Sequence, residues 1–155
     1  MAFSHPTISN DKWAAVAGTA FAGIATGCLT FVSFVDARSF LTHVDKNEND
    51  LIQRHFPVWW PNGRDLMVPV LLSGAASNTL AYLRTNHVHF AITAGLLGLI
   101  GPYTAIILGE DIEALRQSDL KEVGETARSF CNLHHPRLIA AAAGFGLALV
   151  ALADL

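Results

Sequence analysis

Four long stretches of the chain contain no Asp, Glu, Lys or Arg, and they constrain the fold more than any other feature. They lie between Lys12 and Asp36, Asp65 and Arg84, Arg84 and Glu110, and Arg137 and Asp154. A helix that crosses the hydrocarbon core of a bilayer needs about 20 apolar residues. A soluble bundle would instead need a polar stripe on every helix, which none of these stretches has. The sequence therefore predicts an all-α, four-helix transmembrane bundle with spans at about residues 13–35, 66–83, 88–109 and 136–153.

The composition agrees with a membrane protein and excludes one class of partner. Hydrophobic residues make up 52% of the chain and charged residues 15%, whereas soluble domains have roughly 25% charged residues. The net charge of -3 offers no basic patch, so we expect a lipid bilayer and no nucleic acid as partner. Cys28 and Cys131 are expected to be ordinary buried thiols.

The start of the first span supports two further predictions. Residues 1–11 are polar and are expected to form a surface tail that ends in a helix cap. The apolar stretch that follows is long for a signal peptide, so we expect a retained span and no cleaved presequence. The helix is predicted from about Lys12 to about Leu41.

Small and amide residues within the spans predict where the helices pack. Gly23 and Gly27 form a G-x-x-x-G pair, a pattern that lets another helix backbone approach closely. Asn78 is the strongly polar interior residue of a helix predicted from about Asn62 to Leu83. Because an amide in hydrocarbon needs an internal partner, we expect it to form a hydrogen bond between helices.

The segment of residues 42–61 is polar at first and then mixed, and it predicts an interfacial segment. Trp59 and Trp60 stand just before the second span, and tryptophan favours the membrane–water boundary. They are expected to be interface anchors, and stacking on a ligand is the alternative. Prolines at 69 and 136 are expected to kink or bend their helices.

Residues 110–133 predict a hairpin outside the membrane. Apolar positions keep helical spacing from Ile106 to Leu115, and the pattern breaks at Ser118 and Asp119. Asp119 followed by Glu122 resembles a capping box at the start of a new helix. The third and fourth helices are therefore expected to extend beyond the bilayer as an antiparallel pair.

The distribution of basic residues predicts the orientation. Lysine and arginine gather in the first and third loops, at Arg38, Lys46, Arg54, Arg64, Arg116, Lys121, Arg128 and Arg137, and only Lys12 and Arg84 lie on the other side. The positive-inside rule places these loops on the cytoplasmic or mitochondrial matrix side. Both termini would face the opposite side, and the inner mitochondrial membrane is one location that fits.

The densest cluster of ionisable groups lies where the hairpin meets the membrane. Glu110 and Asp111 end the third span, close in the predicted hairpin to His134 and Arg137. A carboxylate can orient a histidine and make it a general base near neutral pH. The alternative is a structural network in which Arg137 pairs with one of the carboxylates.

A metal or haem site is the weaker interpretation of this cluster. Glu110 and Glu113 share a helix face, and His134 or His135 could complete a shell. The chain lacks the E-x-x-H and H-x-x-x-H patterns that metal-binding helices normally show. His87 and His89 lie at the opposite end of the membrane from His134, so no bis-histidine haem pair is evident. We therefore predict no metal and no cofactor.

Two short motifs accompany the four-span architecture. The third helix ends with P-Y-T-x-x-I-L and the fourth opens with F-x-x-L-H-x-x-R; the residues concerned are Pro102, Tyr103, Thr104, Phe130, Leu133, His134 and Arg137. With its four spans in about 150 residues, the chain resembles the anthrone-oxygenase-like membrane proteins, a family largely of unknown function. The chain departs from the family pattern in having Gly109-Glu110-Asp111 after the third helix and phenylalanine in place of tryptophan at 130.

The resemblance implies a cofactor-independent oxygenase that turns a polyketide anthrone into an anthraquinone. A base such as His134 would remove an acidic C–H proton, and the carbanion would react with O₂ directly. Arg137 would stabilise the enolate. On this interpretation, the partner is a lipid-soluble aromatic molecule in a cavity between the helices.

A second interpretation is a non-catalytic accessory subunit of a larger membrane complex, for instance a respiratory-chain assembly. The small-residue helix faces and the projecting hairpin favour it, and other membrane subunits would then be the partners. A transporter is a third class, and it would need paired broken helices or an inverted repeat.

Overall fold

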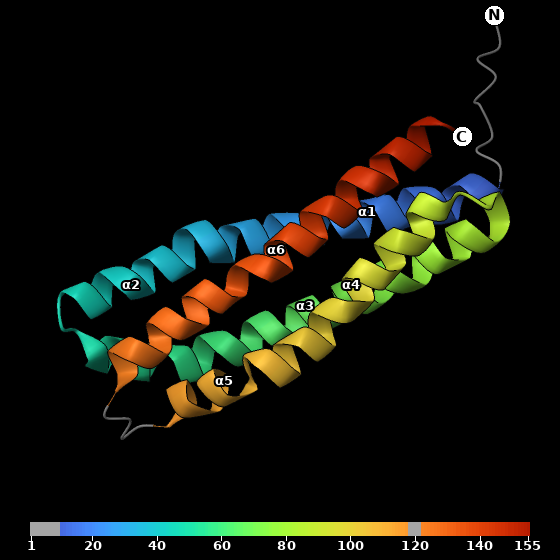
Figure 1. Ribbon diagram of the computed structural model, residues 1–155. Helices are drawn as coiled ribbons and strands as arrows, with labels where there is room; N and C mark the ends of the chain where they lie inside the picture. Colours follow the sequence, from blue (N-terminus) through green and yellow to red (C-terminus); the bar gives the residue numbers. More distant parts are fainter. Residues whose placement is uncertain (1–9, 118–121) are drawn as a thin grey trace, which may run out of the picture.

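The computed structural model describes residues 10–117 and 122–155, and these form a bundle of helices (Figure 1). The elements in chain order are α1 (Asn10–Phe31), the π-helical turn η1 (Val32–Asp36), α2 (Ala37–Asp45), α3 (Asn49–Thr85), α4 (Val88–Ile107), α5 (Gly109–Arg116) and α6 (Val123–Ala153). The all-α prediction is confirmed. Of the tail predicted for residues 1–11, residues 1–9 lie outside the described residues, as does the break predicted at Ser118 and Asp119, whereas α1 already begins at Asn10.

The elements combine into four long arms that run side by side. The first arm is α1, η1 and α2, the second is α3, the third is α4 with α5, and the fourth is α6 (Figure 1). Within the described residues, four helices are long and apolar enough to cross a membrane, at Lys12–Asp45, Asn49–Thr85, Val88–Ile107 and Val123–Ala153. These helices fit an integral membrane protein.

The second arm begins much earlier in the chain than the sequence predicts. Helix α3 starts at Asn49 and continues through Pro57, Pro61 and Pro69, whereas the helix was expected from about Asn62. Its 37 residues rise about 55 Å at 1.5 Å per residue, which exceeds the roughly 30 Å of a hydrocarbon core. The bundle therefore extends past the hydrocarbon core at the end where α2 meets α3.

Tertiary packing explains why the helix persists through two prolines. Ile52 and Phe56 of α3 are buried in a core that all four arms build at this end of the bundle. Phe56 meets Phe130 of α6 edge to face, with ring centroids 5.3 Å apart. Burial of such side chains stabilises a helix more than local propensity does. A second hairpin, α2 with the start of α3, thus packs against the predicted one.

The apolar half of the bundle packs through small residues. A Cβ atom at Gly18 would lie 2.8 Å from Cγ of Asn78, and one at Gly23 would lie 3.1 Å from the ring of Phe145. Around Gly27 such an atom would meet nothing within 4 Å. The side-chain amide of Asn78 donates to the carbonyl of Gly74 in its own helix. The close approach of α1 and α3 is therefore at Gly18.

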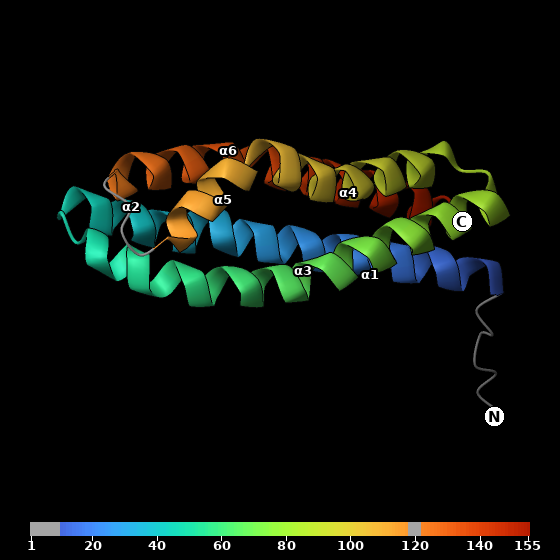
Figure 2. The ribbon, with the colours of Figure 1, turned by 90° about the horizontal axis from the view of Figure 1, so that it is seen from below.

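The third arm breaks at Leu108, although the apolar spacing predicts one continuous helix. Helix α4 ends at Ile107 and α5 begins at Gly109, so the fully buried Leu108 joins two separate helices. Figure 2 shows α5 turning away from the line of α4 toward the start of α3. By contrast, α6 continues through Pro136.

Candidate functional site

A π-helical turn in the first arm faces α6 at the middle of the bundle. Its residue Ser33 is buried, and the hydroxyl lies 2.9 Å from Nδ1 of His134. A single π turn inserts an extra residue into a helix and often occurs at functional sites. Here it brings a polar side chain against a buried imidazole.

His134 is only 2% exposed and has one ring nitrogen engaged by Ser33. The imidazole also meets the ring of Phe130 at a centroid distance of 6.2 Å. Its Nε2 has no hydrogen-bond partner in the described part of the chain, although the atom is not completely buried. His134 is also one of the residues that line a cavity, described below.

Arg137 lies almost one turn beyond His134 and is 6% exposed. Its Nη1 donates to the hydroxyl of Thr104 at 3.1 Å, and its Nε is buried without a partner. No ion pair joins Arg137 to a carboxylate of residues 10–117 or 122–155. A buried charge is normally paired, whereas this guanidinium has no counter-charge among the described residues.

Both side chains line a cavity of about 380 Å³ to which all four arms contribute. The walls are almost entirely apolar, and they comprise Leu29, Val32, Trp59, Trp60, Gly63, Arg64, Met67, Val68, Leu71, Ile100, Gly101, Thr104, Ala105, Gly109 and Ile112. An apolar pocket with a few convergent polar groups is typical of small-molecule sites. His134, Arg137 and Thr104 supply those groups here.

Trp59 and Trp60 form an aromatic wall of this cavity. The indole N–H of Trp59 donates to Oδ2 of Asp36 at 3.0 Å, which fixes the ring. The ring of Trp60 is parallel to that of Phe56, with centroids 6.1 Å apart. The two tryptophans, expected as interface anchors, are thus also placed to contact an aromatic ligand.

The two carboxylates predicted to join the site do not line the cavity. Glu110 is exposed on α5, and Asp111 has a buried Oδ2 without a partner in the described residues. The break at Leu108 starts a new helix, so the faces of Glu110 and Asp111 are set independently of α4. The described residues contain no group of three or more His, Cys, Asp or Glu side chains that could hold a metal.

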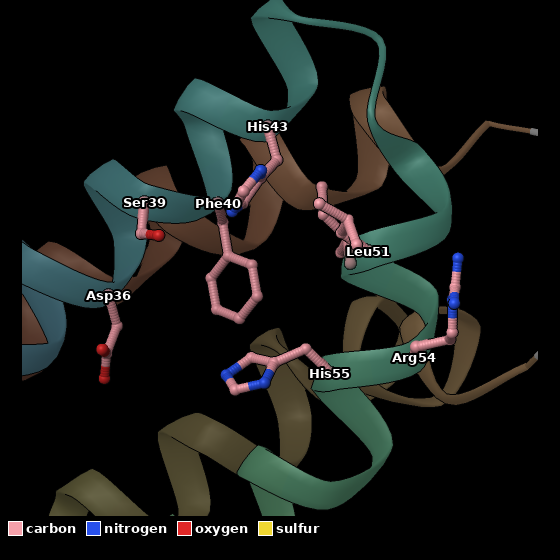
Figure 3. A pocket seen from close by; sticks show the side chains of 8 residues that line it. Asp36, Ser39, Phe40, His43, Leu51, Arg54 and His55 are labelled. Atoms are coloured by element: carbon pink, nitrogen blue, oxygen red, sulfur yellow. The ribbon is translucent and has the colours of Figure 1, made fainter.

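A second hollow, of about 440 Å³, lies between α2 and the start of α3 (Figure 3). It is lined by Asp36, Ser39, Phe40, His43, Leu51, Ile52, Arg54 and His55. Nδ1 of His43 lies 2.8 Å from Oε2 of Glu48, and Arg54 pairs with Asp50. Because its charged groups have partners outside the hollow, it is the weaker candidate.

Sequence patterns did not indicate Ser33 or the role of Thr104. Ser33 is an isolated hydroxyl in an apolar stretch, and a serine there more often bonds to its own helix. The π turn that directs it toward His134 has no local sequence signal. Thr104 stood in the motif at the end of the third helix, but its contact with Arg137 depends on how α4 packs against α6.

The Ser33–His134 contact predicts a measurable loss of stability. Replacing Ser33 by alanine would leave Nδ1 of His134 buried without a partner, which costs about 1–3 kcal/mol. Ser33→Ala should therefore lower the midpoint of thermal unfolding in detergent. Ser39→Ala, at an exposed serine of α2, is the matched control and should leave the midpoint unchanged. Equal midpoints for the two variants would contradict the contact.

Comparison of the chain with models of protein families, with curated proteins and with solved structures gives no match.

Proposed function

We propose that this chain binds a lipid-soluble aromatic molecule in the cavity at His134 and Arg137 and oxidises it with O₂ without a cofactor. The observation that carries the proposal is the combination of an apolar, tryptophan-lined cavity with a buried imidazole and a guanidinium that has no ion-pair partner among the described residues. Such an arrangement suits a ligand with an apolar body and one group on which negative charge develops.

The chemistry requires a carbon acid next to a carbonyl group, as in an anthrone. Nε2 of His134 accepts the proton, and Arg137 stabilises the enolate oxygen that forms. The carbanion adds to O₂, the imidazolium returns the proton to the peroxide, and loss of water leaves a ketone. One oxygen atom enters the product and the other leaves as water, so the step needs no external reductant.

The cavity lies toward the end of the bundle where α2 meets α3 and α5 precedes α6. Eight of the ten lysines and arginines belong to the two segments, residues 36–65 and 110–137, that the sequence predicts on one side of the membrane. The positive-inside rule therefore places this end of the bundle on the cytoplasmic or matrix side, with the inner mitochondrial membrane as one location.

An accessory role in a larger membrane complex is the second candidate function. It is favoured by Leu51 and Val58, two large apolar side chains that are exposed on the part of α3 predicted to lie outside the hydrocarbon core. Another subunit could cover them. Retention of the chain in a large multi-subunit particle after mild detergent extraction would support this candidate.

The test of the oxygenase proposal uses the full chain in lipid nanodiscs with anthrone as the substrate. We expect saturable oxidation above the rate of empty nanodiscs, with one O₂ consumed per anthraquinone formed. With ¹⁸O₂, one labelled oxygen should appear in the product and one in water. Failure of the nanodiscs to bind anthrone saturably, or oxidation no faster than in empty nanodiscs, would overturn the proposal.

A further inference from the structure

The cavity has a mouth between α3 and the third arm, and that mouth is built from small residues. Gly63 of α3, Gly101 and Ala105 of α4 and Gly109 of α5 are all among the lining residues. A Cβ atom placed on any of these three glycines would meet nothing within 4 Å. The space in front of them is therefore open.

The separation of the helices explains the opening. About midway along α4, α3 and α4 still pack tightly: a Cβ atom at Gly74 would lie only 2.9 Å from Cδ1 of Leu97. Figure 2 shows the two helices diverging from their connecting turn toward α5. The cavity occupies the wider part, where glycine and alanine leave it unblocked.

The mouth lies within the apolar belt of the molecule. Val68 lines the cavity and is 47% exposed, and its neighbour Leu66 is 55% exposed. On α4, Ile106 directly follows the lining residue Ala105 and is 76% exposed. Side chains of this kind on a membrane span face lipid, so the opening at Gly101 faces the hydrocarbon rather than water.

The other end of the mouth reaches the polar boundary. Arg64 lines the cavity, is exposed, and pairs with Asp65 at 2.7 Å. Gly63 stands beside this charged pair, whereas Gly101 lies inside the predicted third span. The mouth therefore offers two distinguishable routes, one from the bilayer at Gly101 and one from the interface at Gly63.

We propose that the ligand enters sideways from the bilayer through the gap between α3 and α4 at Gly101 and Ala105. The ligand is an aromatic amphiphile that leads with a weakly acidic group, which becomes the counter-charge of Arg137. This inference rests on the proposed ligand site but not on the oxygenase chemistry. The guanidinium, which is more than nine-tenths buried, calls for an acidic group on the ligand, and the apolar mouth calls for an apolar body.

The test uses a long-chain dibromophenol as the probe, because bromine quenches tryptophan and the phenol dissolves in lipid. A Trp13→Phe background leaves Trp59 and Trp60 of the cavity wall as the reporters. Nanodiscs holding the full chain are mixed with vesicles that contain the probe, and the rate of saturable quenching is followed. The methyl ether of the same phenol measures quenching by probe that is merely dissolved in the bilayer.

A phenylalanine at Gly101 should block the entrance, so Gly101→Phe should slow saturable quenching at least tenfold. Gly98→Phe is the matched control, because Gly98 is on the same helix, is equally open, and does not line the cavity. Its rate of saturable quenching should lie within twofold of the rate in the Trp13→Phe background protein. Gly63→Phe, at the interfacial end, should have a smaller effect than Gly101→Phe.

Three other outcomes would overturn the proposal, and they distinguish a wrong entrance from a wrong ligand site. If saturable quenching in Gly101→Phe is as fast as in the Trp13→Phe background protein, the lateral entrance is wrong and the ligand site stands. If Gly63→Phe alone slows quenching, the ligand enters from the aqueous interface. If the background protein shows no saturable quenching beyond that of the methyl ether, both the entrance and the proposed ligand site fail.

Discussion

An Arg137→Met variant should be more stable than the wild type and should have lost its ligand. The guanidinium is 6% exposed, has a buried Nε without a partner, and has no described carboxylate beside it. Replacing even a buried ion pair by well-packed apolar side chains of similar volume is often neutral or stabilising by about 1–4 kcal/mol, and the guanidinium of Arg137 has no such pair among the described residues to offset its desolvation. Methionine has a similar length and fits the apolar walls. Thermal unfolding in the same detergent measures the gain.

The same substitution should raise the dissociation constant for an acidic phenol about 30-fold or more. Truncating one partner of a buried charge pair costs about 2–5 kcal/mol, and each 1.4 kcal/mol corresponds to a factor of ten. Arg64→Met is the matched control, because Arg64 also lines the cavity but is exposed and paired with Asp65. It should change both stability and binding little.

Two results would contradict this interpretation of Arg137. A large loss of stability in Arg137→Met would show that its bond to Thr104 is an essential structural contact. Unchanged binding of the phenol would show that the ligand does not supply the counter-charge. Increased stability combined with lost binding is what we expect of a charge that is kept for function.

The sequence predicted the four arms because charge-free stretches of membrane length have few alternatives. It did not predict where the second arm begins. Pro57 and Pro61 are strong signals for the end of a helix, and nothing local outweighs them. Only the burial of Ile52 and Phe56 against the other arms does so, and that depends on chain segments far away in the sequence.

The candidate site shows the same division between local signals and tertiary geometry. His134 and Arg137 could be named from a short motif on one helix, and they line one cavity. Glu110 and Asp111 were placed beside them because they end the third span in the predicted hairpin, but neither lines the cavity, and a new helix begins at Gly109. Ser33 could not be named, because a π turn changes the direction of a side chain without a sequence signature.

A His134→Asn variant should lose oxidation of anthrone by a factor of about 10²–10⁴, the usual contribution of a general base. Asparagine can keep a polar atom near the position of Nδ1 and so retain the bond to Ser33, but it has no group at the position of Nε2. Thermal stability and binding of the substrate should therefore change little. Anthraquinone formation in nanodiscs measures the loss.

His135→Asn is the matched control for this experiment. His135 is the next residue on α6, but it is exposed, its Nδ1 lies 3.2 Å from the carbonyl of Asn132, and it does not line the cavity. It should oxidise anthrone at the wild-type rate. Equal losses in the two variants would point to a disturbance of α6 rather than to a lost base.

A second measurement separates proton removal from the reaction with O₂. Under argon in D₂O, the wild type should exchange the acidic C–H hydrogens of anthrone faster than empty nanodiscs, and His134→Asn should lose this exchange together with oxidation. If the variant keeps the exchange and loses only oxidation, His134 acts after the carbanion has formed, as the acid that protonates the peroxide. If it keeps both, the base is another group, and the buried imidazole serves only to tie the π turn to α6 through Ser33.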